Sequence, residues 1–168
     1  DGALRLVQEI PANGCTEMQI FARENDFLLC GAEYQSEPNA SGTGQTRLVL
    51  YALSPSGDSL KQLAQLSLQS ELLAGTARMD AEGHLVIYDV TENLYRYYTD
   101  TLAPVKTVRE PENCLMGELH FTEDESAAFY VDSGTDTLMR LNTATGETQP
   151  LTFEDAFLDG YTIDGLYD

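Results

Sequence analysis

Basic residues and tryptophan are scarce in this sequence. Its 168 residues include nine lysines and arginines against 28 aspartates and glutamates, a formal net charge of −19, and no tryptophan. A surface this acidic repels a phosphate backbone and an anionic bilayer, which argues against nucleic-acid binding and membrane-surface binding. A cationic partner, calcium or a saline exterior suits the charge better, although solubility alone is the simpler interpretation.

Long apolar runs are also missing. No stretch approaches the roughly 20 apolar residues that cross a bilayer, and the first residues show no basic region followed by an apolar one. The sequence therefore predicts no membrane insertion. Because 42% of the residues are hydrophobic, it does predict a folded protein with a core.

Cysteine is rare and odd in number, with Cys15, Cys30 and Cys114. No CxxC pair occurs and neither histidine is close to a cysteine in sequence, which argues against a zinc site. Two states of the thiols remain open. One is a disulfide between Cys15 and Cys114. The other, which we favour, is free and partly buried thiols that pack as small hydrophobic groups.

Acidic residues gather at three predicted hairpin tips, but none of the tips has the D-x-D-x-D-G spacing of a calcium loop. We interpret them as ordinary turns and predict neither a metal nor a cofactor. His84 and His120 lie at strand borders without a recognisable nucleophile, so we interpret them as structural. The acidic tips are Glu24/Asp26, Asp80/Glu82 and Glu123/Asp124/Glu125.

The sequence does contain an internal repeat of short strands. Between His84 and Val108, strands alternate with turns, and the same order returns about every 40 to 45 residues. This spacing predicts one all-β domain over residues 1–168, a partial β-propeller of about three to four four-stranded antiparallel blades. The blades cover residues 17–68, 72–111 and 115–153, with partial blade elements at 3–10 and 157–168.

Turn residues and period-two alternation predict four strands in each blade. Met18, Ile20 and Ala22, for example, alternate with polar neighbours, which is typical of a half-buried strand. Residues 60–68 are predicted as a strand, with a short helix as the alternative. The remaining predicted strands are 27–33, 47–53, 73–78, 85–90, 94–98, 105–108, 116–121, 127–131, 138–141 and 149–152.

Two residue pairs mark the repeat between the second and third blades. Tyr88 and Tyr130 lie 42 residues apart, and Arg96 and Arg140 lie 44 apart. We take the members of each pair as equivalent positions. The tyrosines of this region are predicted to pack between blades, with stacking on a sugar ring as the alternative.

The segment LMRLNTATGETQPLT resembles the outer hairpin of bacterial extracytoplasmic β-propeller repeats, in which an apolar-aromatic-basic strand leads into a Thr-Gly turn. LYRYYTDTLAPVKTV is a looser copy. The Trp-Asp ending of WD repeats and the double glycine of kelch repeats are both absent. The resemblance implies the propeller architecture and specifies no chemistry. With the acidic charge and the few lysines, it leads us to expect an extracellular or cell-surface location in a bacterium.

Three full repeats and two pieces do not close a ring of about six to eight blades. A four-bladed ring would need the segments 3–10 and 157–168 side by side. Two further arrangements are open: the chain is a piece of a longer protein, which we favour, or two copies of it complete a ring together. In both of these, exposed blade faces contact missing blades or another chain, because large apolar faces seldom stay solvent-facing.

The predicted ligand site is a loop surface. Residues 35–46 form an insertion rich in Ser, Gly, Asn and Pro between two strands. In a propeller this connection lies on the same face as the links between blades, where loops on a rigid scaffold carry recognition groups. The alternative is a solvated insertion without a role. The candidate ligand-binding residues are Tyr34, Glu37, Asn39, Arg109 and Glu112.

These observations predict a non-catalytic interaction module of propeller type that binds a protein or a carbohydrate. No catalytic residue can be named. A first alternative is part of a propeller hydrolase or lyase whose catalytic residues lie outside this chain. A second alternative is a half-ring assembly domain that dimerises.

Overall fold

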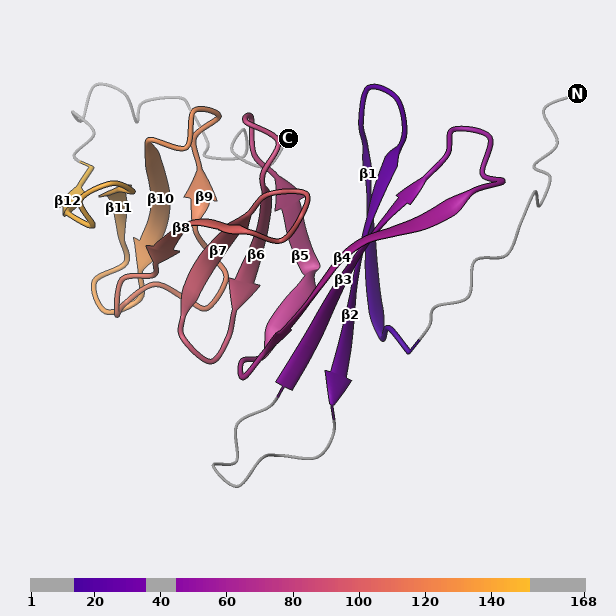
Figure 1. The fold of residues 1–168 in the computed structure, drawn as a ribbon. Coiled ribbons are helices and arrows are strands. Elements are labelled where there is room, and N and C mark those ends of the chain that lie inside the picture. The colour runs from indigo at the N-terminus through magenta and orange to yellow at the C-terminus, as the bar shows by residue number, and fades with distance from the viewer. Residues whose placement is uncertain (1–13, 36–44, 152–168) are drawn as a thin grey trace, which may run out of the picture.

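The fold was derived from a computed structural model, which describes residues 14–35 and 45–151 (Figure 1). All regular elements of these residues are strands, and they form three antiparallel sheets of four strands each. The predicted elements 3–10 and 157–168 lie outside the described residues. Sheet 1 contains β1 (Glu17–Ala22), β2 (Phe27–Gln35), β3 (Gln45–Leu53) and β4 (Leu60–Leu68). Sheet 2 contains β5 (Leu72–Met79), β6 (Leu85–Asp89), β7 (Leu94–Tyr98) and β8 (Pro104–Arg109). Sheet 3 contains β9 (His120–Phe121), β10 (Ala127–Asp132), β11 (Thr137–Asn142) and β12 (Thr148–Pro150).

Each sheet is a meander in which neighbours in the chain are neighbours in the sheet. The three sheets stand side by side and pack face to face, as propeller blades do, without closing into a ring (Figure 1). The predicted all-β class and four-stranded blades are therefore confirmed. The described residues contain no helix with the length and apolar character that a membrane crossing requires.

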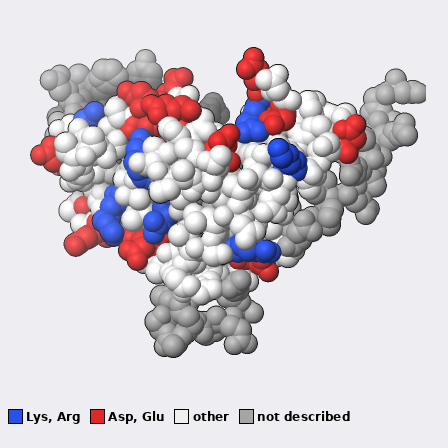
Figure 2. All heavy atoms as spheres, in the orientation of Figure 1, with Lys and Arg blue, Asp and Glu red and all other residues white. Residues whose placement is uncertain are grey.

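The stack has two ends, which we name by their connections. The hairpin end, at the top of Figure 1, carries the β1–β2, β5–β6 and β9–β10 turns. The link end, at the bottom, carries the end of β2, the start of β3, the β6–β7 turn and the links between sheets. The acidic tips therefore lie at the hairpin end, and Figure 2 shows acidic side chains along the top of the molecule. Of the predicted ligand-binding residues, Tyr34, Arg109 and Glu112 lie at the link end.

Sheet 2 is the centre of the molecule because both of its faces are covered. All five residues of β6 are buried, since alternate side chains point to opposite sheets. Leu85 and Ile87 pack toward sheet 1, against Leu28 and Leu50. The apolar run of residues 85–88 is the expected signature of this two-sided burial, and the buried Asp89 that ends the strand is paired with Arg96 at 2.6 Å.

The interface between sheets 2 and 3 is aromatic. Tyr88, Tyr95 and Tyr97 of sheet 2 pack against Tyr130 and Leu141 of sheet 3. The Tyr88 and Tyr95 ring centroids lie 5.0 Å apart. The prediction that tyrosines pack between blades is confirmed for these residues.

The observed repeat differs by one residue from the predicted equivalences. Asp89 pairs with Leu94 across one turn, and Asp132 pairs with Thr137 across the corresponding turn, 43 residues later. The last residues of both turns, Asn93 and Asp136, have positive φ angles of 51° and 52°. An offset of 43 makes the pairings Tyr88/Tyr130 and Arg96/Arg140 wrong, because a slip of one residue turns a side chain to the other face.

Most strand predictions are confirmed to within two residues at each end. Residues 60–68 pair with β3 along their length, so the helix alternative is wrong. Strand 116–121 is shortened to His120–Phe121, because the chain turns at Gly117. That glycine has φ +78°, and the backbone N–H of Glu118 donates to the Leu115 carbonyl at 3.0 Å.

The outer edges of sheets 2 and 3 both carry proline. Pro104 begins edge strand β8 and pairs with Tyr98, and Pro150 lies in edge strand β12 opposite Met139. Proline has no N–H to donate and is tolerated at a sheet edge.

Candidate functional site

Tyr34 is the last residue but one of β2, at the link end, where it ties sheet 1 to sheet 2. Its hydroxyl donates to the Leu72 carbonyl at 2.5 Å and contacts a Glu17 carboxylate oxygen at 3.1 Å. Burial, helped by the Glu17 carboxylate, raises the pKa of Tyr34 to about 12. The Tyr34 hydroxyl, which we predicted to bind a ligand, is therefore hydrogen-bonded within the fold. Its half-buried ring is part of the contact between sheets 1 and 2.

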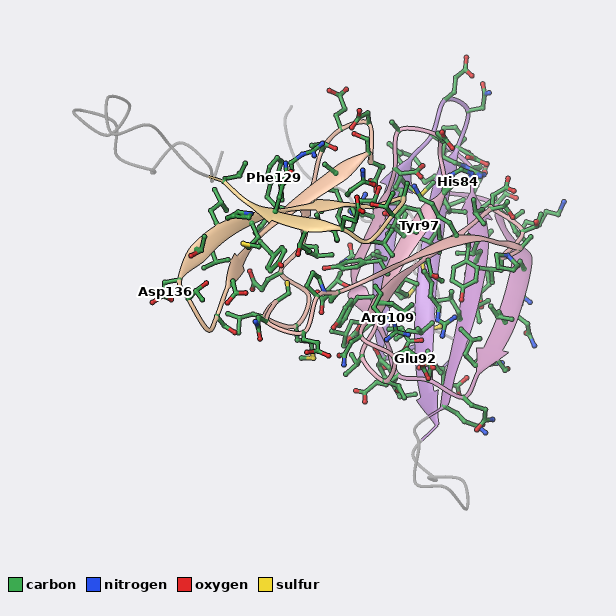
Figure 3. The ribbon with its side chains drawn as sticks, turned by 90° about the vertical axis from the view of Figure 1, so that its left-hand side faces the viewer. His84, Glu92, Tyr97, Arg109, Phe129 and Asp136 are labelled. Carbon is green, nitrogen blue, oxygen red and sulfur yellow. The ribbon has the colours of Figure 1, made fainter. Side chains whose placement is uncertain are left out.

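Arg109 lies at the end of β8, on the same end of the molecule (Figure 3). Its guanidinium donates to the Glu92 carbonyl at 2.7 Å, and Nη2 lies 3.9 Å from a Glu92 carboxylate oxygen. The side chain is 64% exposed, so it is held in place and still open to solvent. Glu112 is exposed in the link that follows. Glu37 and Asn39 lie outside the described residues.

Glu110 is a buried carboxylate beneath this surface that the sequence did not predict. One oxygen accepts a hydrogen bond from the Tyr88 hydroxyl at 2.6 Å and the other accepts the Gly117 amide at 2.8 Å. It thereby fastens the β8–β9 link to sheet 2. No residue pattern distinguishes Glu110 from its neighbour Glu112 in the sequence, because burial here depends on where the link crosses the sheet.

The three cysteines are free, and the Cys15–Cys114 disulfide is not formed. Cys15 lies against Gly31 of sheet 1, whereas Cys114 packs on the aromatic core between sheets 2 and 3. Burial raises the pKa of Cys30 to about 12. Burial, followed by the charges of Glu110 and Glu118, raises the pKa of Cys114 to about 12 as well. All three behave as packing groups, as predicted.

An open hollow of about 520 Å³ lies at the hairpin end, between the β5–β6 turn and β9. Arg78 and Glu125 meet in its wall as an ion pair, with a second contact of 3.2 Å between Arg78 Nη2 and Glu125 Oε2. The Tyr97 hydroxyl also donates to Glu125, and the Arg78 guanidinium lies 4.5 Å from the centre of the Phe121 ring. Arg78, Glu125 and Tyr97 thus form one connected polar set in the wall, and His120 and Glu123 line the same hollow beside it.

Glu125 occupies an unusual position for a carboxylate. It has a left-handed φ of 57° in the β9–β10 turn, and its side chain is only 9% exposed. Burial, followed by the hydrogen bond to Glu125, raises the pKa of Tyr97. The sequence predicted an acidic turn at residues 123–125 but gave no indication that one of its members points inward.

Asp80, Glu82 and His84 bring three metal-ligating atoms within 4.8 Å of one another in the β5–β6 turn. The His84 Nδ1 atom lies 2.9 Å from Asp80 and 3.5 Å from Glu82. The other Asp80 oxygen accepts the backbone amides of Glu82 and His84, at 3.0 and 2.8 Å. Burial opposes ionisation of Asp80, but the His84 hydrogen bonds outweigh it and lower the pKa. The contacts within the turn account for this geometry.

No family model, curated protein or solved structure was found to match the chain. The arrangement of the strands therefore defines its class: an all-β protein of three four-stranded antiparallel sheets stacked like propeller blades. Buried Glu125 joins the β9–β10 turn of sheet 3 to sheet 2, and buried Glu110 joins the β8–β9 link to sheet 2. The exposed polar groups at the link end are the remaining candidates for recognition.

Proposed function

We propose that the protein is a non-catalytic interaction module of propeller type that recognises a protein or a carbohydrate at its link end. The observation that carries this proposal is the convergence of connections there. β2 ends and β3 begins at this end of the stack, and the β6–β7 turn and the β8–β9 link lie there as well (Figure 1). Loops on a packed scaffold are the usual carriers of recognition groups.

Arg109 is the group best placed for a ligand. It is anchored by the Glu92 carbonyl and remains 64% exposed, so less side-chain freedom is lost when a partner binds. Exposed Glu112 adds a carboxylate in the next link. A guanidinium beside carboxylates suits a polar ligand with both hydrogen-bond donors and acceptors, such as a sugar or a peptide.

The fate of the buried carboxylates supports a binding role over a catalytic one. Glu110 and Glu125, the two buried glutamates of the described residues, each accept hydrogen bonds from two or more donors. Such groups position chain segments. A general base must instead reach a substrate proton.

The acidic charge supports a location outside a bacterial cell. A net charge of −19 with few lysines favours solubility in a saline medium and attraction to cationic partners. Both properties suit a protein exposed on a cell surface.

The test is a binding screen of the full chain against a glycan array and a panel of immobilised cationic and neutral peptides. For the ligands found, we expect the Arg109→Ala/Glu112→Ala variant to bind at least tenfold more weakly. The matched control is Glu82→Ala, which removes an exposed carboxylate at the hairpin end. Equal losses in both variants, or no ligand in either panel, would contradict a link-end recognition surface.

A further inference from the structure

The outward face of sheet 3 is apolar and uncovered by the other sheets. Phe129, Val131 and Leu138 point away from sheet 2, because Tyr130 and Leu141 on the alternate positions pack toward it. None of the three belongs to a core cluster of the described residues, and Val131 is 52% exposed. Figure 3 shows Phe129 on this outer side.

This face is a copy of an interface that already exists in the molecule. With the 43-residue offset set by the two turns, its positions correspond to the face of sheet 2 that packs on sheet 3. The outward face of sheet 3 is as apolar as the equivalent face of sheet 2, except that one arginine replaces a tyrosine. The equivalent residues are Val86 and Phe129, Tyr88 and Val131, Tyr95 and Leu138, and Tyr97 and Arg140.

The complementary face lies at the other end of the stack, on sheet 1. It is the face of sheet 1 that is turned away from sheet 2. Sheet 2 uses the corresponding face to pack on sheet 1, and sheet 3 uses it to pack on sheet 2. Leu29, Val49 and Tyr51 form a cluster at its centre. Ile20 beside them is 60% exposed, and Met18 packs against the cluster.

We infer that a second copy of this chain covers both faces. Sheet 3 of each copy packs on sheet 1 of the other, which continues the face-to-face contact seen twice within the chain. Two such contacts, related by a twofold axis, close a ring of six sheets, which is within the usual range of about four to eight blades. The inference rests on the propeller-type architecture of the proposed function and is independent of its ligand.

The positions of two opposite charges support a second copy of the chain as the partner of these faces. Arg140 takes the position of Tyr97 and forms no ion pair with any described residue. Tyr97 meets the carboxylate of Glu125 in the first hairpin turn of the next sheet. The first hairpin turn of sheet 1 lies between β1 and β2 and holds exposed Glu24. In the continued stack, Arg140 of one copy therefore faces Glu24 of the other.

The first test is sedimentation velocity of the full chain over a range of concentrations. We expect a species of twice the 18.5 kDa chain mass. Val131→Asp should weaken the dimer at least tenfold or leave only monomer. Val105→Asp is the matched control, since Val105 is 44% exposed on edge strand β8 of the middle sheet. A monomer at all concentrations, open polymers, or equal effects of both variants would overturn the inference.

The second test reverses the charges. Arg140→Glu and Glu24→Arg should each weaken the dimer several-fold, and the two changes together should restore it. Circular dichroism of each variant as a monomer shows whether the fold is kept. Failure of the double variant to recover would contradict the pairing. Binding of the glycan and peptide panels is measured on the same variants, so loss of the dimer and loss of the ligand surface are separate results.

Discussion

Sheet 2 packs on sheet 1 and on sheet 3 with different kinds of side chain. Toward sheet 1 the buried set is largely aliphatic, with Leu28, Leu50 and Ile87 at its centre. Toward sheet 3 it is built on Tyr88 and Tyr97, which are fully buried. Aliphatic groups need only shape complementarity, whereas a buried tyrosine hydroxyl also needs a hydrogen-bond partner.

The aromatic interface therefore has a polar anchor at each end. Glu110 accepts the Tyr88 hydroxyl at the link end, and Glu125 accepts the Tyr97 hydroxyl at the hairpin end. Across the interface with sheet 1, the buried Thr46 hydroxyl accepts the Leu72 amide at 3.1 Å, and Glu17 accepts the Gly75 amide at 2.7 Å at the rim. The comparison indicates that the contact between sheets 2 and 3 is the more sensitive to charge and pH, and the contact between sheets 1 and 2 to side-chain volume.

The largest effect is expected from truncation of the aromatic interface. Tyr97→Ala removes a buried ring and leaves Glu125 without one of its donors, so the free energy of unfolding should fall by about 4 kcal/mol. Ile87→Ala, on the opposite face of the same sheet, should cost about 3 kcal/mol from the cavity alone. Denaturant unfolding measures both. If Ile87→Ala proves the more costly, the polar anchor contributes nothing.

A smaller loss is expected when only the charge of the anchor is removed. Glu125→Gln keeps the volume but leaves the Arg78 guanidinium without its anion, so unfolding should become easier by about 1–3 kcal/mol. Glu123→Gln, an exposed change in the same turn, should alter stability by no more than about 0.5 kcal/mol. Thermal unfolding of the two variants provides the comparison. Equal midpoints would show that Arg78 does not depend on this carboxylate.

The smallest effect at neutral pH is expected from Tyr88→Phe, about 1 kcal/mol for one hydrogen bond. The variant is more informative at high pH, where the tyrosine ionises. Burial, followed by the Glu110 hydrogen bond, raises the pKa of Tyr88 above its usual value of 10. A raised pKa in the folded state stabilises the fold below pH 10, and this contribution is lost as the pH rises further. Wild-type stability should fall from about pH 10 upward, and less steeply in Tyr88→Phe. Denaturant unfolding between about pH 8 and 12 measures the slopes, and identical slopes would contradict the assignment.

The strands and sheets could be predicted from the sequence, but the buried glutamates that act as polar anchors, Glu110 and Glu125, could not. Alternation and turn residues located the strands, because those signals are local: Gly57 and Gly83 adopt the positive φ angles that their turns require. Blade equivalences failed by one residue, since an apolar run such as residues 85–88 of β6 does not indicate which face each side chain takes.

The candidate site shows the same limit. The strand order expected of a propeller blade indicated that the links between blades share one end, and Arg109 lies there, exposed. The sequence gave no sign that the Tyr34 hydroxyl is taken up by Leu72 and Glu17, because these partners come from other strands. Glu110 and Glu125 were missed for the same reason: burial of a carboxylate depends on long-range packing.

The prolines at the outer margins bear on how this protein avoids uncontrolled self-association. An open sheet edge offers a row of N–H and C=O groups to any passing strand, and this is a common route to amyloid. Pro104 in β8 and Pro150 in β12 interrupt that row on sheets 2 and 3. Strand addition at these two edges is thereby discouraged, so contact through the edges of sheets 2 and 3 is disfavoured relative to contact through their side-chain faces.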